Sequence, residues 1–302
     1  MKLLLVFLFS IFIVYSVKAQ SLRSMEDEIS LTVRTSIKAK DDAEKLLSNA
    51  KLLSQVENLL KDKGSFHFTF DSLLKFKMLL ESSDGEVRIY NWAIQMDDKT
   101  FRYFGFIQHQ SKKNKREADV FPLSDKSDEI KNPELAQLSD KKWFGAFYNT
   151  IILTKVRKKK IYTLLGWDGN DRITQKKLIE TLSFNSSGGI VFGEPVIEIE
   201  KEISAYKKVK VNNRRLIFEY KQGIFMTLKW HEKDGLIVYD VLGPTDSSKK
   251  GQFSDYGPTL ALDAFKWKKG KWILQRDPDA RNEKTEKDKE HKTPVPIPDP
   301  PK

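Results

Sequence analysis

The chain has 302 residues, a formal net charge of +11 and no cysteine. Without cysteine it can form neither a disulfide nor a thiolate zinc site, and thiol-based catalysis is excluded. The length suits one large domain or two modest ones, and the excess of lysine and arginine favours solubility and affinity for anionic surfaces.

The first twenty residues have the pattern of a secretory signal peptide. Lys2 supplies the positive charge, residues 3–17 are almost wholly apolar, and residues 17–19 (Val-Lys-Ala) fit a small-residue cleavage site. The apolar run is about 15 residues, whereas a membrane-spanning helix needs about 20. We therefore expect residues 1–19 to be removed, no transmembrane span to remain, and the protein to be periplasmic or extracellular. An uncleaved membrane anchor is the alternative.

Residues 20–64 are predicted to form a helical segment. From residue 41 onward, leucine and valine recur near a period of 3.6 residues, which is typical of an amphipathic helix. Asp41 and Asp42 precede this pattern and Gly64 follows it, as helix ends prefer. We expect the apolar face to pack on the protein's own domain, with binding to a membrane or a partner as the alternative.

Residues 65–275 alternate β-rich runs with short turns, which is typical of antiparallel hairpins. In residues 224–230 one face of a strand is predicted to carry Ile224, Met226, Leu228 and Trp230, and the other face Phe225, Thr227 and Lys229. The predicted hairpin turns are residues 97–99, 155–159, 222–223, 233–235 and 268–270.

Three segments depart from this pattern. Residues 175–182 are predicted to form one inserted helix, and residues 112–133 a long polar loop. Residues 276–302 are charged and then proline-rich, and they are predicted to be a disordered tail. The expected fold class is α+β, with the helical segment packed on a mainly antiparallel β-rich domain built as a meander, a sandwich or a partly open barrel.

The stretch Trp167-Asp168-Gly169-Asn170-Asp171 is the strongest candidate for a binding site. It does not fit a calcium-binding EF-hand loop, which needs an oxygen ligand at position 5, glycine at position 6 and glutamate at position 12. Counted from Asp168, those positions hold arginine, isoleucine and isoleucine. We predict a turn in which Asp171 or Thr174 caps a following helix. The alternative is a site in which Trp167, Asp168, Asn170 and Asp171 hold a sugar or a cation.

No catalytic or cofactor motif is present. The four histidines lack metal-binding spacing, and the chain has no nucleophile elbow, phosphate-binding loop or dinucleotide fingerprint. A pair of carboxylates could serve hydrolysis, but nothing in the sequence selects the pair. We therefore predict no catalytic residue, no metal site, no cofactor and no nucleic-acid partner.

Tryptophans and basic residues are concentrated in particular segments of the sequence. The six tryptophans all fall in β-rich runs and are predicted to be core residues, with sugar stacking as the alternative. The basic runs at residues 112–116, 155–160 and 207–215 are predicted to be turns and protected strand edges, with an anion-binding patch as the alternative.

Six segments resemble a family of uncharacterised secreted proteins from Bacteroidetes bacteria. They are GEVRIYNWAIQ, FRYFGFIQ, YTLLGWDGND with KKLIETLSF, RRLIFEYK and DAFKWKKGKWILQRDPDARN. The resemblance covers roughly residues 65–282 and implies export, but it transfers no activity and no functional residue.

The sequence thus predicts an exported, non-catalytic envelope or secreted protein that binds a protein or an anionic polysaccharide. A hydrolase of envelope glycans or proteins that uses paired carboxylates is the alternative.

Overall fold

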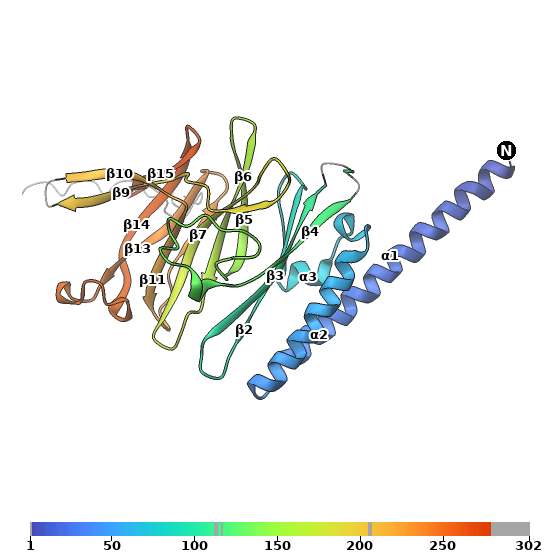
Figure 1. The fold of residues 1–302 in the computed structure, drawn as a ribbon, viewed down its shortest axis with the longest axis horizontal. Coiled ribbons are helices and arrows are strands. Elements are labelled where there is room, and N and C mark those ends of the chain that lie inside the picture. Colours follow the sequence, from blue (N-terminus) through green and yellow to red (C-terminus); the bar gives the residue numbers. More distant parts are fainter. Residues whose placement is uncertain (1, 112–113, 116, 205–206, 279–302) are drawn as a thin grey trace, which may run out of the picture.

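The computed structural model describes residues 2–111, 114–115, 117–204 and 207–278. Helices at the N-terminus are followed by three open, mainly antiparallel β-sheets, and Figure 1 shows these elements as successive layers. The α+β class predicted from the sequence is confirmed. The expected disordered tail lies outside the described residues from residue 279 onward.

The helical layer consists of α1 (Lys2–Ser36), α2 (Asp42–Lys61) and the short α3 (Asp71–Lys75). α2 begins as predicted, because the Asp41 carboxylate accepts the backbone N–H of Glu44 and so caps the first turn. The side chain of Glu26 on α1 is fully buried and accepts the backbone N–H groups of Ser72 and Leu73 at the start of α3. No helix in the described part of the chain has the length and apolarity that a membrane crossing requires.

The first sheet has the order β1-β2-β3-β4 and carries the helices on one face. Its strands are β1 (Leu79–Glu81), β2 (Val87–Gln95), β3 (Phe101–Gln110) and β4 (Ala118–Leu123). Successive side chains of β2 point to opposite faces, so that Tyr90 packs under the helices while Ile89 packs toward the second sheet. The predicted loop over residues 112–133 is wrong in part, because it contains β4.

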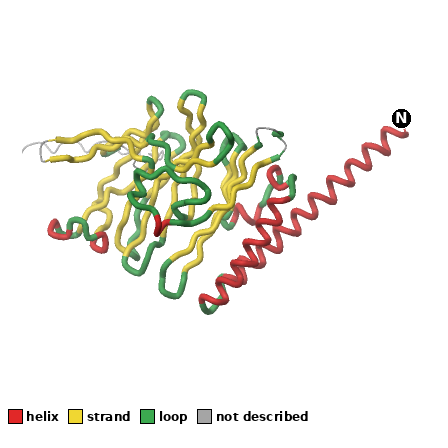
Figure 2. The backbone as a smooth tube through the Cα atoms, viewed as in Figure 1, coloured by secondary structure: helices red, strands yellow, loops and turns green. Residues whose placement is uncertain are grey.

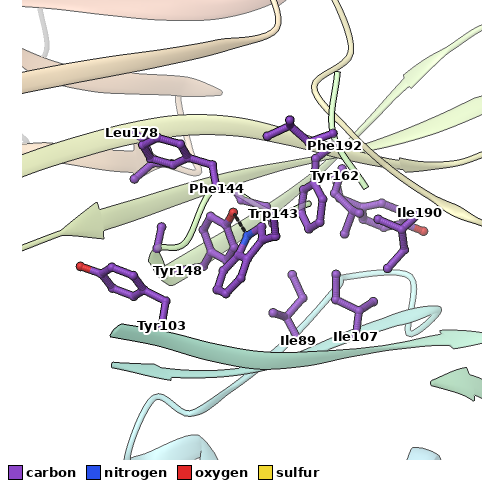
Figure 3. Close-up of a cluster of buried hydrophobic side chains, with 14 of the residues drawn as sticks. Ile89, Tyr103, Ile107, Trp143, Phe144, Tyr148, Tyr162, Leu178, Ile190 and Phe192 are labelled. Atoms are coloured by element: carbon purple, nitrogen blue, oxygen red, sulfur yellow. Dashed lines mark hydrogen bonds between the residues drawn. The ribbon is translucent and has the colours of Figure 1, made fainter. Parts of the chain in front are cut away.

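The second sheet lies between the first and the third. Its order is β11-β7-β6-β5, and β8 (Ile190–Phe192) pairs with β7. Its long strands are β5 (Phe147–Val156), β6 (Lys159–Asp168), β7 (Thr174–Phe184) and β11 (Arg215–Lys221). Figure 3 shows the core between the first two sheets, where Ile89 and Ile107 face Trp143, Tyr148 and Tyr162.

The helix predicted over residues 175–182 is wrong, because these residues form the central strand β7. Leu178, Ile179 and Leu182 have a spacing that a helical stripe also shows. In the fold, Leu178 and Leu182 enter the core shared with the first sheet, while Ile179 enters the core shared with the third. A strand that is buried on both faces loses the simple alternation of apolar and polar residues.

The third sheet has the order β10-β9-β15-β14-β13-β12. Its strands are β9 (Ile197–Ser204), β10 (Lys207–Asn213), β12 (Leu228–His231), β13 (Leu236–Pro244), β14 (Tyr256–Lys268) and β15 (Lys271–Arg276). Only the pairing of β15 with β9 is parallel among the strand pairs of the described residues. Figure 2 shows the β9–β10 hairpin extending away from the stacked sheets.

Four of the five predicted hairpins are confirmed: β2–β3, β5–β6, β12–β13 and β14–β15. The hairpin at residues 222–223 is wrong, because β11 pairs with β7 and β12 belongs to the third sheet. The strand predicted over residues 224–230 begins only at Leu228, but the predicted alternation of its two faces holds. Met226 and Leu228 are buried in the core between the second and third sheets, whereas Phe225 is 79% exposed.

Candidate functional site

The turn between β6 and β7 is built by two aspartates that accept backbone hydrogen bonds. Oδ1 of Asp168 accepts the N–H of Asn170 at 2.8 Å. Oδ1 of Asp171 accepts the N–H groups of Ile173 and Thr174 at 2.7 and 2.8 Å. Such bonds are typical of turns closed by aspartate side chains. The predicted helix cap is therefore wrong, since a strand follows, but the predicted turn is confirmed.

Glycine at residue 169 leaves room for a ring of the first sheet that packs against the turn. A Cβ atom at Gly169 would lie 2.2 Å from the ring of Phe101 on β3. Asn170 then takes the left-handed backbone conformation with φ of 49°, which asparagine tolerates better than most residues. The sequence Asp-Gly-Asn thus lets the β6–β7 turn dock against β3.

A buried hydrogen-bond pair joins the turn to the first sheet. The hydroxyl of Tyr103 on β3 donates to Oδ1 of Asp168 at 2.9 Å and accepts the N–H of Gly169 at 2.7 Å. Burial raises the pKa of Asp168, and the ammonium of Lys176, 3.8 Å from the other carboxylate oxygen, opposes that rise. Burial, together with the neighbouring Asp168, also raises the pKa of Tyr103, so this hydroxyl remains a donor.

A cleft of about 820 Å³ opens beside this contact. Its walls are formed by the start of β3, the end of β4 with the segment 124–129 that follows it, Phe144, and the β6–β7 turn. Asp168, Asn170 and Asp171 all line it, so the structure brings three of the four predicted binding residues together. Trp167 is not among the lining residues; its ring packs edge-on against Phe101 and its Nε1 donates to Gln175.

The sequence does not predict the cleft wall formed by residues 124–129. Asp125 shapes this wall, because its Oδ1 accepts the N–H and the hydroxyl of Ser127 and the N–H of Gly145. The only sequence signal was the run Ser-Asp-Lys-Ser-Asp-Glu, which is rich in turn-forming and acidic residues. It gives no indication of which other segment it faces.

The charges of the cleft are mixed, with an excess of carboxylates. The acidic lining residues are Asp125, Asp128, Glu129, Asp168 and Asp171, and the basic ones are Arg102, Lys126 and Lys176. Lys126 forms an ion pair with Glu129 at 2.7 Å. In the described residues, no group of three or more acidic, histidine or cysteine side chains is arranged to hold a metal ion. The lining suits a ligand that both donates and accepts hydrogen bonds.

The chain was compared with known protein families, curated proteins and solved structures. No protein-family model matches the chain, and no significant match was found among curated proteins or solved structures.

Asp168→Asn tests the electrostatics of the cleft wall. The new amide oxygen can accept the same hydrogen bonds, while the charge that burial disfavours is removed. We expect the variant to unfold at a higher temperature than the parent protein at about pH 7. As the pH falls through the raised pKa of Asp168, the folded parent takes up a proton before the unfolded chain does, so the difference should shrink. Melting temperatures measured by circular dichroism across this range check the prediction, and a difference that grows in acid would contradict it.

Proposed function

We propose that the protein is an exported, non-catalytic binding protein whose cleft beside the β6–β7 turn takes a hydroxyl-rich segment of a polysaccharide. The chemical composition of the cleft lining supports this proposal. Carboxylates, an amide, hydroxyls and cationic groups surround an opening that also includes Phe101, Phe104 and Phe144. Sugar hydroxyls donate and accept hydrogen bonds, and aromatic rings pack against the apolar faces of sugar rings.

A binding role is favoured because the two best-placed carboxylates maintain the protein's own structure. Oδ1 of Asp168 accepts hydrogen bonds from the hydroxyl of Tyr103 and the N–H of Asn170. Oδ1 of Asp125 accepts hydrogen bonds from the hydroxyl of Ser127 and the N–H of Gly145. The excess of acidic groups favours a neutral polysaccharide in this cleft over an anionic one. Export rests on the signal-peptide pattern of residues 1–19 and on the resemblance to secreted proteins of Bacteroidetes.

Titration calorimetry with a panel of neutral oligosaccharides tests this function. Arg102 and Asp128 line the cleft and are exposed, so replacing each with alanine leaves the core intact. We expect each replacement to weaken binding by about tenfold, the change that 1.4 kcal/mol produces. Asp27→Ala, an exposed carboxylate on α1, is the matched control and should bind as the parent does. If every oligosaccharide fails to bind, or both cleft variants bind normally, the proposal fails.

A hydrolase is the second candidate, and one observation favours it. Burial raises the pKa of Asp168, and the nearby Asp125 raises it further, as an acid catalyst next to a second carboxylate requires. Incubation of the protein with the same oligosaccharides, followed by a reducing-end assay, separates the two functions. A binding protein releases no new ends. Turnover that Asp168→Asn abolishes would establish the hydrolase instead.

A further inference from the structure

A second surface, which shares no lining residue with the cleft, is built from tryptophan. A shallow groove of about 550 Å³ lies where residues 152–155 of β5 meet the third sheet. Trp230 of β12, Trp267 of β14 and Trp272 of β15 line it. We call these lining residues, together with Lys155 and Lys266, the tryptophan groove.

The three rings have different roles in the tryptophan groove. Trp272 is fully buried, and its Nε1 donates to the hydroxyl of Thr163 at 2.8 Å, so it forms the floor. Trp230 and Trp267 contact it edge-on, with ring centroids 6.0 and 5.3 Å away, and both are partly exposed. Trp272 is therefore a core residue, as predicted for the tryptophans. The rings of Trp230 and Trp267 are only partly buried, so a ligand in the groove can contact them.

The charged residues that line the tryptophan groove in the described part of the chain are both lysines, Lys155 and Lys266. Glu232 and Asp234 lie in the turn that contributes Gly235 to this groove. The turns after β5 and β14 meet beside it, since a Cβ atom at Gly270 would lie 3.4 Å from the side chain of Val156. These turns add Arg157, Lys158, Lys268 and Lys269, all exposed.

None of these six cations has an ion-pair partner among the described residues. Their neighbours behave differently: Lys159 pairs with Glu194, Lys160 with Asp84 and Glu86, and Lys271 with Glu198. Lysine at turns also protects strand edges and aids solubility. That role does not require unpaired cations from two separate turns to converge on partly exposed tryptophans.

We propose that the tryptophan groove binds an acidic polysaccharide, with sugar rings packed on Trp230 and Trp267 and carboxylate or sulfate groups held by the surrounding cations. Charge complementarity selects an anionic ligand, and the aromatic walls select one with flat apolar faces. The site differs from the cleft in position and in charge. It does not depend on ligand binding in the cleft, and it shares with the proposed function only the expectation of export. For an exported chain, acidic polysaccharides are more accessible partners than nucleic acids.

Binding of a galacturonic acid hexamer, followed by intrinsic tryptophan fluorescence and calorimetry, tests the proposal. Two variants of the groove are Trp267→Ala and the double variant Lys155→Ala with Lys268→Ala, which removes one exposed cation from each of the β5–β6 and β14–β15 hairpins. Each should weaken binding by about tenfold or more, which corresponds to 1.4 kcal/mol. The double variant alters only exposed side chains, so it remains informative even if Trp267→Ala impairs folding.

The matched control removes two cations elsewhere. Lys249 and Lys250 are exposed next to a short turn of helix after β13, and replacing both with alanine should leave binding unchanged. An equal loss in this control would mean that net charge alone attracts the ligand, and the proposal would be wrong. It would also be overturned if an oligothymidine of equal charge, or vesicles of anionic phospholipid, bound more tightly than the hexamer and showed the same dependence on Trp267.

Discussion

Replacing Arg215 with methionine will lower the free energy of unfolding by about 3–5 kcal/mol, because it leaves a buried carboxylate without its partner. Arg215 and Glu180 are both fully buried and form an ion pair on neighbouring strands β11 and β7. The other oxygen of Glu180 accepts a hydrogen bond from the hydroxyl of Tyr148. That hydroxyl accepts a hydrogen bond from the indole N–H of Trp143, with a donor–acceptor distance of 2.8 Å. Figure 3 shows the contact between Trp143 and Tyr148.

This network also supports the candidate site. Arg215 donates to the carbonyl of Pro133, and its guanidinium lies over the ring of Phe144, which lines the cleft. The ion pair therefore ties the segment between β4 and β5, with its cleft-lining residues, to the second sheet. We expect Arg215→Met to weaken ligand binding in the cleft as well as stability.

Urea denaturation measures the effect. Lys210→Met, which breaks an exposed pair with Glu198, is the control and should change the stability within experimental error. The double variant Arg215→Met with Glu180→Gln should recover part of the loss, since no buried charge then remains. A loss of less than about 1 kcal/mol in the single variant would show that water reaches Glu180 and compensates it.

Trp272→Ala should cost about 3–5 kcal/mol, as the removal of a large buried aromatic side chain does. Trp272 is fully buried in the core between the second and third sheets, and its hydrogen bond to Thr163 joins β15 to β6. The alanine variant leaves both a cavity and an unpaired hydroxyl.

Two further variants separate the contribution of the hydrogen bond from that of burying the ring. Thr163→Val removes only the hydrogen bond and leaves the indole N–H unpaired, which should cost about 1–3 kcal/mol. Phe225→Ala removes a ring that is 79% exposed and should leave the unfolding midpoint nearly unchanged. Chemical denaturation of the three variants gives the comparison. If Thr163→Val cost as much as Trp272→Ala, the burial of the ring would not be the main contribution.

Local signals in the sequence determined much of the architecture. The cap at Asp41, four hairpin turns and the alternation through residues 224–230 are properties of adjacent residues, and each was predicted correctly. The Asp-Gly-Asn turn was also predicted, because backbone N–H groups within four residues satisfy its aspartates.

Only the tertiary structure decided what covers each face and which distant segments meet. β7 was mistaken for a helix because two sheets bury its opposite faces, and β11 was paired with the wrong neighbour because strand pairing joins residues far apart in the chain. The cleft and the tryptophan groove arise in the same way, from segments that carry no signal of one another. Periodicity in a sequence records that a face is buried, but the partner of that face is set by packing and hydrogen bonds formed over long separations.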